Sequence, residues 1–155
     1  MQQRILLGAV SALALISPLA AGAAPPAYIP HAAAPGAAPL PFSDAVLAGD
    51  TLYLAGHIGI DAHSGNVPGD PDSEAKQVMD AVQHTVEAAG LRMDDLVSVT
   101  VFCTDLGLYD RFNAVYRGYF HGHYPARAFI GADKLVRGAH FEVMGIALRA
   151  QPAPH

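Results

Sequence analysis

Charged residues are distributed very unevenly along this chain of 155 residues. All 14 acidic residues and eight of the nine basic residues follow residue 43, and only Arg4 precedes it. A soluble domain carries many charged side chains on its surface, so the first 43 residues do not have the composition of one. The sequence therefore predicts a single folded domain over residues 42–150, a length that suits one hydrophobic core.

The first 23 residues have the pattern of an export signal. Arg4 precedes a long apolar run that ends at Ala21-Gly22-Ala23, a small-residue cleavage motif. This order predicts a signal peptide over residues 1–23, cleaved after Ala23. The mature protein is then expected to be periplasmic or secreted, without stable membrane association. An uncleaved membrane anchor is the alternative interpretation of the same run.

Two further segments lie outside the expected domain. Residues 24–41 contain six Pro and seven Ala. Because Pro breaks helices and removes backbone donors, this composition predicts an extended, mobile linker. Residues 151–155 are expected to form a frayed tail.

Hydrophobic periodicity in the domain predicts five strands and two helices. Apolar residues recur with helical spacing between residues 73 and 89, where Asp72 or Ser73 can cap the start and Gly90 the end. A second apolar stripe follows Asp105 and ends before Pro125. Strands are expected over 43–47, 51–60, 97–104, 126–132 and 140–150.

The resulting order, ββαβαββ, predicts an α+β fold with one sheet and both helices packed on one face. The last two strands are expected to pair antiparallel through the 133–139 loop. No segment of the chain is left to cover the second face of the sheet, although apolar residues lie on it. Self-association is the simplest way to cover that face.

Composition also excludes several classes of function. The net charge of −5 disfavours a sequence-independent hold on nucleic acid. With a single cysteine, Cys103, the chain has no internal disulfide and no multi-cysteine zinc site, and this residue is expected to be a small core side chain. The pairs His121-x-His123 and His140-x-Glu142 each supply too few ligands for a familiar metal site. No nucleophile elbow, Walker motif or dinucleotide fingerprint is present.

Two charged residues lie on strands that are otherwise apolar. Arg127 opens the strand that contains Phe129, and Glu142 lies between Phe141 and Val143. A guanidinium on such a strand needs an anionic partner, and its planar fork suits a carboxylate. If the last two strands pair, Arg127 and Glu142 lie within a few positions of each other. From spacing alone, a structural ion pair at a subunit contact and a substrate site remain equally open.

Residues 40–150 resemble the RidA family of imine deaminases, also called the endoribonuclease L-PSP group. Order and spacing agree over most of the domain. The most specific matches are Pro125-Ala126-Arg127, Leu135, Arg137-Gly138-Ala139 and Phe141-Glu142-Val143. Supporting matches are Ala48-Gly49-Asp50, Gly56, Glu87-Ala88-Ala89-Gly90, Val99-Thr100-Val101, Thr104-Asp105-Leu106 and the segment from Asn113 to Phe120.

The resemblance implies a chorismate-mutase-like fold and a homotrimer with small-molecule clefts between subunits. It implies hydrolysis of 2-imino acids or their enamine tautomers to 2-keto acids and ammonia, without a metal or organic cofactor. The substrate-binding arginine falls on Arg127 and the water-positioning glutamate on Glu142. Gly56 matches a backbone position that lines the pocket, and Asn113 matches a nearby helical residue.

The sequence departs from the family pattern at four positions near the implied pocket. Phe42 stands where the archetype has Tyr, Ala55 where it has Ser, His57 where it has Gln, and Phe129 where it has Cys. Two hydroxyl groups are lost, and a bulky ring enters at Phe129. These changes put the substrate range in question and support an alternative function, a non-catalytic trimer that binds a small carboxylate. Ribonuclease activity, which the older family name implies, is disfavoured by the acidic net charge and by the absence of a basic aromatic platform for RNA.

Overall fold

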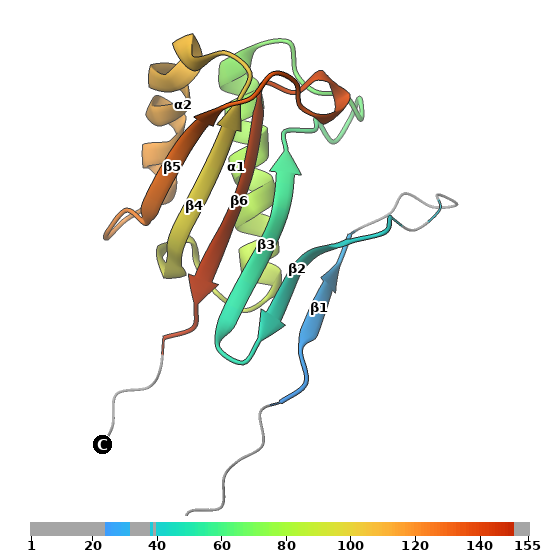
Figure 1. Ribbon diagram of the computed structural model, residues 1–155, viewed down its shortest axis with the longest axis vertical. Coiled ribbons are helices and arrows are strands. Elements are labelled where there is room, and N and C mark those ends of the chain that lie inside the picture. The colour runs from blue at the N-terminus through green and yellow to red at the C-terminus, as the bar shows by residue number, and fades with distance from the viewer. Residues whose placement is uncertain (1–23, 32–37, 39, 151–155) are drawn as a thin grey trace, which may run out of the picture.

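The computed structural model describes residues 24–31, 38 and 40–150. The predicted signal peptide and the C-terminal tail lie outside these residues. One six-stranded mixed sheet has the strand order β1-β2-β3-β6-β4-β5, and two helices pack on one of its faces (Figure 1). The elements are β1 (Ala27–Pro30), β2 (Ser43–Ala48), β3 (Thr51–Ile58), α1 (Pro71–Ala88), β4 (Leu96–Cys103), α2 (Tyr109–Tyr116), β5 (Ala126–Gly131) and β6 (Phe141–Leu148). No helix in the described ranges is long and apolar enough to span a membrane.

The α+β architecture with both helices on one face confirms the prediction. Helix α1 presents Val78, Met79, Val82 and Val86 to the sheet, and all four are buried. Phe112 of α2 is also fully buried in the same core. Cys103 is buried as expected, and burial raises the pKa of its thiol.

Strand β1 lies inside the segment for which the sequence predicts a linker, so that prediction is wrong for Ala27–Pro30. The strand pairs antiparallel with β2, with Tyr28 opposite Val46. Tyr28 and Ile29 favour extended backbone, and Ile29 packs against the core. Pro30 is tolerated because β1 is the edge strand and the register shifts at this residue. The high proline content therefore does not exclude a strand at the sheet edge.

Helix α1 begins earlier than the sequence predicts. Asp70, rather than Asp72 or Ser73, is the N-cap, and its carboxylate accepts a hydrogen bond of 3.0 Å from the Ser73 backbone N–H. Pro71 occupies the first turn, where a missing N–H costs nothing. At the other end Gly90 has φ +74°, the left-handed conformation expected just past a helix.

The expected antiparallel pairing of β5 with β6 is wrong. Strand β5 pairs in parallel with β4, and β6 lies on the other side of β4, between β4 and β3. Helix α2 connects β4 to β5, and a crossover of this kind returns the chain parallel to the first strand. Arg127 is therefore opposite Val99, and Glu142 is opposite Phe102.

The second face of the sheet carries exposed apolar side chains. On β6, Phe141 and Val143 face the helices, so Glu142, Met144, Ile146 and Leu148 share the other face. Met144 and Leu148 are exposed there, as is Tyr53, which is paired with Ile146. This face has no cover from the described part of the chain, as the sequence predicts.

Helix α1 is tied to the start of β6 by a buried carboxylate. Glu74 is fully buried and accepts hydrogen bonds from the backbone N–H groups of His140 (2.6 Å) and Phe141 (2.9 Å). Its second oxygen lies 2.6 Å from His140 Nδ1. A buried carboxylate is tolerated because its oxygens are satisfied in this way.

Replacing Glu74 with alanine is expected to lower the free energy of unfolding by about 3 kcal/mol, because buried donors then lose their acceptor. Urea denaturation measures this change. The matched control is Glu87→Ala, an exposed position on α1 whose side chain bonds only Gln83 among the described residues. The control is expected to change stability by less than about 0.5 kcal/mol. A Glu74 effect as small as that of the control would contradict the assigned role.

Candidate functional site

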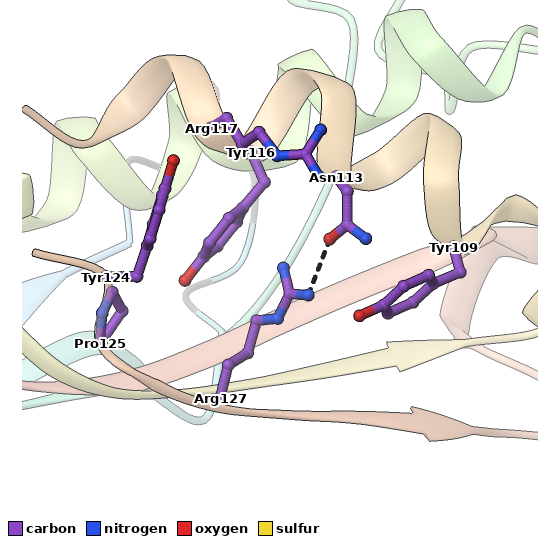
Figure 2. A pocket seen from close by; sticks show the side chains of 7 residues that line it. All are labelled: Tyr109, Asn113, Tyr116, Arg117, Tyr124, Pro125 and Arg127. Carbon is purple, nitrogen blue, oxygen red and sulfur yellow. Dashed lines mark hydrogen bonds between the residues drawn. The ribbon is translucent and has the colours of Figure 1, made fainter.

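Arg127 points from β5 toward α2 and forms the centre of a pocket. Its Nη2 donates a hydrogen bond of 2.7 Å to Asn113 Oδ1, as Figure 2 shows. Among the described residues, no carboxylate forms an ion pair with this guanidinium, and its remaining N–H groups are available to a ligand. The structure thus brings together two predicted site residues, Arg127 and Asn113.

Aromatic rings hold the guanidinium in place. The Arg127 Cζ lies 4.5 Å from the ring centroid of Tyr116 and 5.7 Å from that of Tyr109. Contacts of this kind with a cation contribute about 0.5–2 kcal/mol each and fix the plane of the guanidinium. Because the Tyr116 hydroxyl is buried, its pKa is raised to about 12, and it has no hydrogen-bond partner among the described residues.

The cavity beside Arg127 has a volume of about 260 Å³. A tyrosine-rich wall with two guanidinium groups, Arg127 and Arg117, that form no ion pair among the described residues suits a small organic anion, above all a carboxylate bound by two N–H groups. The lining residues are Tyr109, Asn113, Tyr116, Arg117, Tyr124, Pro125 and Arg127.

Glu142 lies elsewhere, against a bulge of β3. Between Leu54 and His57 the pairing of β3 with β6 is interrupted, and Gly56 falls in this interruption. A Cβ atom on Gly56 would overlap the Glu142 carboxylate, so any larger residue would displace that side chain. The glycine therefore allows the carboxylate to lie directly against backbone.

Arg127 and Glu142 do not meet within one chain. Arg127 faces the helices, whereas Glu142 faces the open side of the sheet, and strand β4 separates their strands. The expectation that they lie within a few positions of each other is wrong, because it rested on a pairing of β5 with β6 that does not form. Within one chain the two groups therefore lie in separate places.

A second cavity, of about 550 Å³, lies beside Gly56. Phe42 and His57 also line it. Burial lowers the pKa of His57, and the ring's Nε2 has no hydrogen-bond partner among the described residues. At its rim, His31 Nδ1 lies 2.9 Å from Asp44 Oδ1.

The two phenylalanines singled out by the sequence lie in different places. Phe42 is half exposed at the second cavity, far along the sheet from β5. Phe129 packs edge-on against Tyr109, with ring centroids 5.0 Å apart, and against Phe112 at 5.6 Å. It is not among the residues that line the Arg127 cavity. The bulky ring at position 129 therefore extends the core and leaves the cavity open.

The histidine pairs do not come together as ligand sets. His140 is bonded to Glu74, and the backbone N–H of His121 donates to Asp94. Within the described ranges, no group of three or more His, Cys, Asp or Glu side chains could hold a metal ion.

Sequence reasoning missed the part that the tyrosines play at the first pocket. Tyr116 belongs to the apolar stripe predicted after Asp105, and it is buried, with only 4% of it exposed. Tyr109 lies seven residues earlier on the same face of α2. This spacing was a usable signal, because two rings on one face of a helix can bracket a cation from a neighbouring strand.

Comparison with known proteins gives a consistent result. Residues 32–149 match the family model described as endoribonuclease L-PSP. The chain is 37% identical to the 2-iminobutanoate/2-iminopropanoate deaminase of Mus musculus over 110 residues, which cover 70% of this chain and 82% of that protein. The protein of the same name from Escherichia coli K12 is 35% identical over 112 residues, covering 70% of this chain and 88% of that protein. The crystal structure of E. coli TdcF with bound serine has a TM-score of 0.70 and 28% identity, covering 79% of this chain and 94% of that chain.

Proposed function

Because the chain belongs to the endoribonuclease L-PSP (RidA) family, we propose that it hydrolyses 2-imino acids, or their enamine tautomers, to 2-keto acids and ammonia. The observation that carries this proposal is the Arg127 guanidinium, which forms no ion pair within the described part of the chain and is fixed by Asn113 and Tyr116 beside a small cavity. The names of the mouse and E. coli relatives support it. The serine bound to TdcF is a molecule of similar size that also carries a carboxylate.

Arg127 binds the substrate carboxylate and so fixes the adjacent imine carbon. A water oxygen adds to that carbon, a proton of the water passes to Glu142, and the π electrons of the C=N bond become a lone pair on nitrogen. Glu142 returns the proton to the nitrogen. It then carries the hydroxyl proton of the adduct to the same nitrogen, while the oxygen forms C=O and the C–N bond breaks. One imine and one water thus give one keto acid and one ammonia.

The direct test generates the imine in the assay. An amino-acid oxidase produces 2-iminopropanoate from alanine, and ammonia release is followed with and without the protein. The protein is expected to accelerate release above the spontaneous rate. If no imino acid in a panel is hydrolysed faster with the protein, the proposed activity is wrong.

The opposite orientation of Arg127 and Glu142 supports a composite site. We propose a homotrimer in which Arg127 of one protomer and Glu142 of the next face the same cleft. The exposed apolar face that includes Tyr53, Met144 and Leu148 provides a surface for this association. No metal or organic cofactor takes part in the proposed reaction, and nucleic acid is not a partner.

A composite site predicts complementation between two inactive variants. When Arg127→Ala and Glu142→Gln protomers are refolded together in equal amounts, about a quarter of the clefts in random trimers contain both functional residues. The mixture is therefore expected to regain about a quarter of the wild-type rate. Mixing each variant with the double variant is the control and should restore no activity. A mixture that stays inactive while mixed trimers form would show that the site is not shared between protomers.

One observation favours a second candidate function, a non-catalytic trimer that binds a small carboxylate. The Arg127 pocket is complete without Glu142, so binding does not require the proposed chemistry. Phe42 and Ala55 also lack the hydroxyl groups of the family pattern. A 2-keto acid that raises the melting temperature, combined with no turnover of any imino acid, would favour this function.

We also propose that the protein acts after export, with cleavage after Ala23. The apolar run and the Ala21-Gly22-Ala23 motif support this proposal. Mass spectrometry of the protein recovered from a periplasmic fraction is expected to find a mature chain that begins at Ala24. Recovery of the full-length chain from the membrane fraction would favour the anchor instead.

A further inference from the structure

Arg117 differs from the other arginines in the described part of the chain, because it has neither a hydrogen bond nor an ion pair. Each of the others is paired with a carboxylate or donates to a carbonyl oxygen; these are Arg92, Arg111, Arg127, Arg137 and Arg149. The chain has 14 acidic residues, so carboxylates are not scarce. Arg117 therefore lacks a partner because of where it lies.

The place of Arg117 is the cavity beside Arg127. Arg117 is the C-cap of α2, one helical turn after Asn113, and it lines this cavity. Residues four apart on a helix share a face, so Arg117 and Asn113 both turn toward β5. In Figure 2 both guanidinium groups are directed toward the Asn113 side chain, Arg117 from the helix and Arg127 from the strand.

The lining of the cavity is cationic and includes no carboxylate among the described residues. Besides the two arginines it consists of three tyrosines, Asn113 and Pro125. Two like charges that share a cavity of about 260 Å³ repel each other, and a partly enclosed space screens this repulsion less than open water does. An anionic ligand between them removes the repulsion, and an uncharged ligand does not.

A third polar group of the cavity wall also lacks a partner. The Tyr116 hydroxyl is buried and has no hydrogen-bond partner among the described residues. Its ring lies between the Arg127 Cζ, 4.5 Å from the ring centroid, and the Tyr124 ring, whose centroid is 6.4 Å away. Buried donors in folded proteins are normally satisfied. Unsatisfied N–H and O–H groups from three side chains therefore converge on one cavity, which indicates a ligand with several acceptor oxygens.

A single carboxylate does not use both guanidinium groups. One guanidinium binds a carboxylate through two parallel N–H···O bonds, which engage both oxygens. In the proposed function the carboxylate next to the imine carbon is bound by Arg127. Arg117 is then left for a second acidic group, and the methyl or ethyl side chain of 2-iminopropanoate or 2-iminobutanoate offers none.

We propose that Arg117 is a specificity-determining residue, and that the preferred substrates are 2-imino acids with a second carboxylate on the side chain, such as those derived from aspartate and glutamate. This inference rests on the proposed function and names its substrate class. The imine carbon of such a substrate lies between its two carboxylates. Holding both ends fixes that carbon more firmly than Arg127 does alone.

A comparison of substrates tests the inference. Imines of alanine, leucine, aspartate and glutamate are generated by amino-acid oxidases that accept each amino acid. The wild-type kcat/KM is expected to be at least about fivefold higher for the better acidic imine than for the alanine imine. This preference should shrink at high salt, because Arg117 is exposed and its attraction for a carboxylate is screened. A preference for the alanine or leucine imine would overturn the inference while the deaminase proposal stands.

Replacing Arg117 identifies the residue responsible. Arg117→Gln is expected to lower the acidic-to-alanine ratio of kcat/KM by about fivefold, and Arg117→Lys should keep part of the ratio because it keeps the charge. The matched control is Arg92→Gln, the same change at an exposed position outside the cavity lining, which should keep the wild-type ratio. An unchanged ratio in Arg117→Gln, or separation of its subunits, would mean that Arg117 serves another purpose, and the inference would be wrong.

Binding of keto acids separates this inference from the proposed activity. The better of oxaloacetate and 2-oxoglutarate is expected to bind the wild-type protein at least about fivefold more tightly than pyruvate, as measured by calorimetry, and this difference should disappear in Arg117→Gln. If the difference is found but no imine is hydrolysed faster, the deaminase proposal is wrong and the assignment of Arg117 to a second carboxylate stands. Equal affinities for pyruvate and both dicarboxylates would contradict the assignment, whatever the kinetic assays show.

Discussion

Replacing Arg127 with alanine is expected to abolish the acceleration of imine hydrolysis, with a fall in kcat/KM of at least about 100-fold. A charge-assisted pair with a carboxylate is worth several kcal/mol when its partner is lost from a desolvated pocket. The loss also removes the positioning of the imine carbon, so binding and turnover decline together. Steady-state kinetics over a range of imine concentrations measures both effects.

Two controls separate this loss from misfolding. The Arg127→Lys variant keeps the positive charge but not the planar fork, and it is expected to recover part of the binding and little of the turnover. Size-exclusion chromatography and far-UV circular dichroism should show the same assembly and fold for all variants. A folded alanine variant that retains more than about a tenth of the wild-type kcat/KM would exclude Arg127 as the carboxylate ligand.

Replacing Glu142 with glutamine is expected to lower kcat by about 10²–10⁴-fold, the usual contribution of a general acid–base group. The amide has nearly the same shape, so the fit against Gly56 is kept, but it cannot accept and return the proton of water. KM should change by less than about threefold, because the substrate carboxylate is bound by Arg127. Single-turnover measurements distinguish the chemical step from product release.

The matched control for Glu142 is Glu87→Gln, the same substitution at an exposed position on α1. It should leave kcat unchanged, since Glu87 bonds only Gln83 among the described residues. A large rise in KM with unaltered kcat in Glu142→Gln would instead indicate that this carboxylate binds substrate. The proposed role in proton transfer would then be wrong.

Local patterns in the sequence predict most of the secondary structure. The apolar stripe of α1 and the alternation along β6 reproduce the faces seen in the structure, because burial of one face is a local requirement with a fixed period. The position of β6 between β3 and β4 depends instead on tertiary packing. The strand–helix–strand order around α2 already implied that β4 and β5 run parallel.

The candidate site was likewise predictable only in part, because local patterns mark single residues and not how the strands are ordered. A charge on an apolar strand singles out Arg127 and Glu142, and the family resemblance supplies the chemistry proposed for them, whereas their separation onto opposite faces could not be predicted. That separation follows from the strand order, which a spacing argument assumed incorrectly. The cavity beside Gly56 combines residues from five separate segments, and no periodicity within any one of them marks it.

The orientation of Arg127 and Glu142 also affects how the reaction rate depends on protein concentration. If the site is shared between protomers as proposed, a solitary protomer presents each group to a different side and is expected to have no activity. At concentrations where subunits separate, the rate should rise more steeply than in proportion to protein added, and become proportional only once association is complete. A fall in expression that lets the subunits separate is therefore expected to lower turnover more than in proportion to the loss of protein.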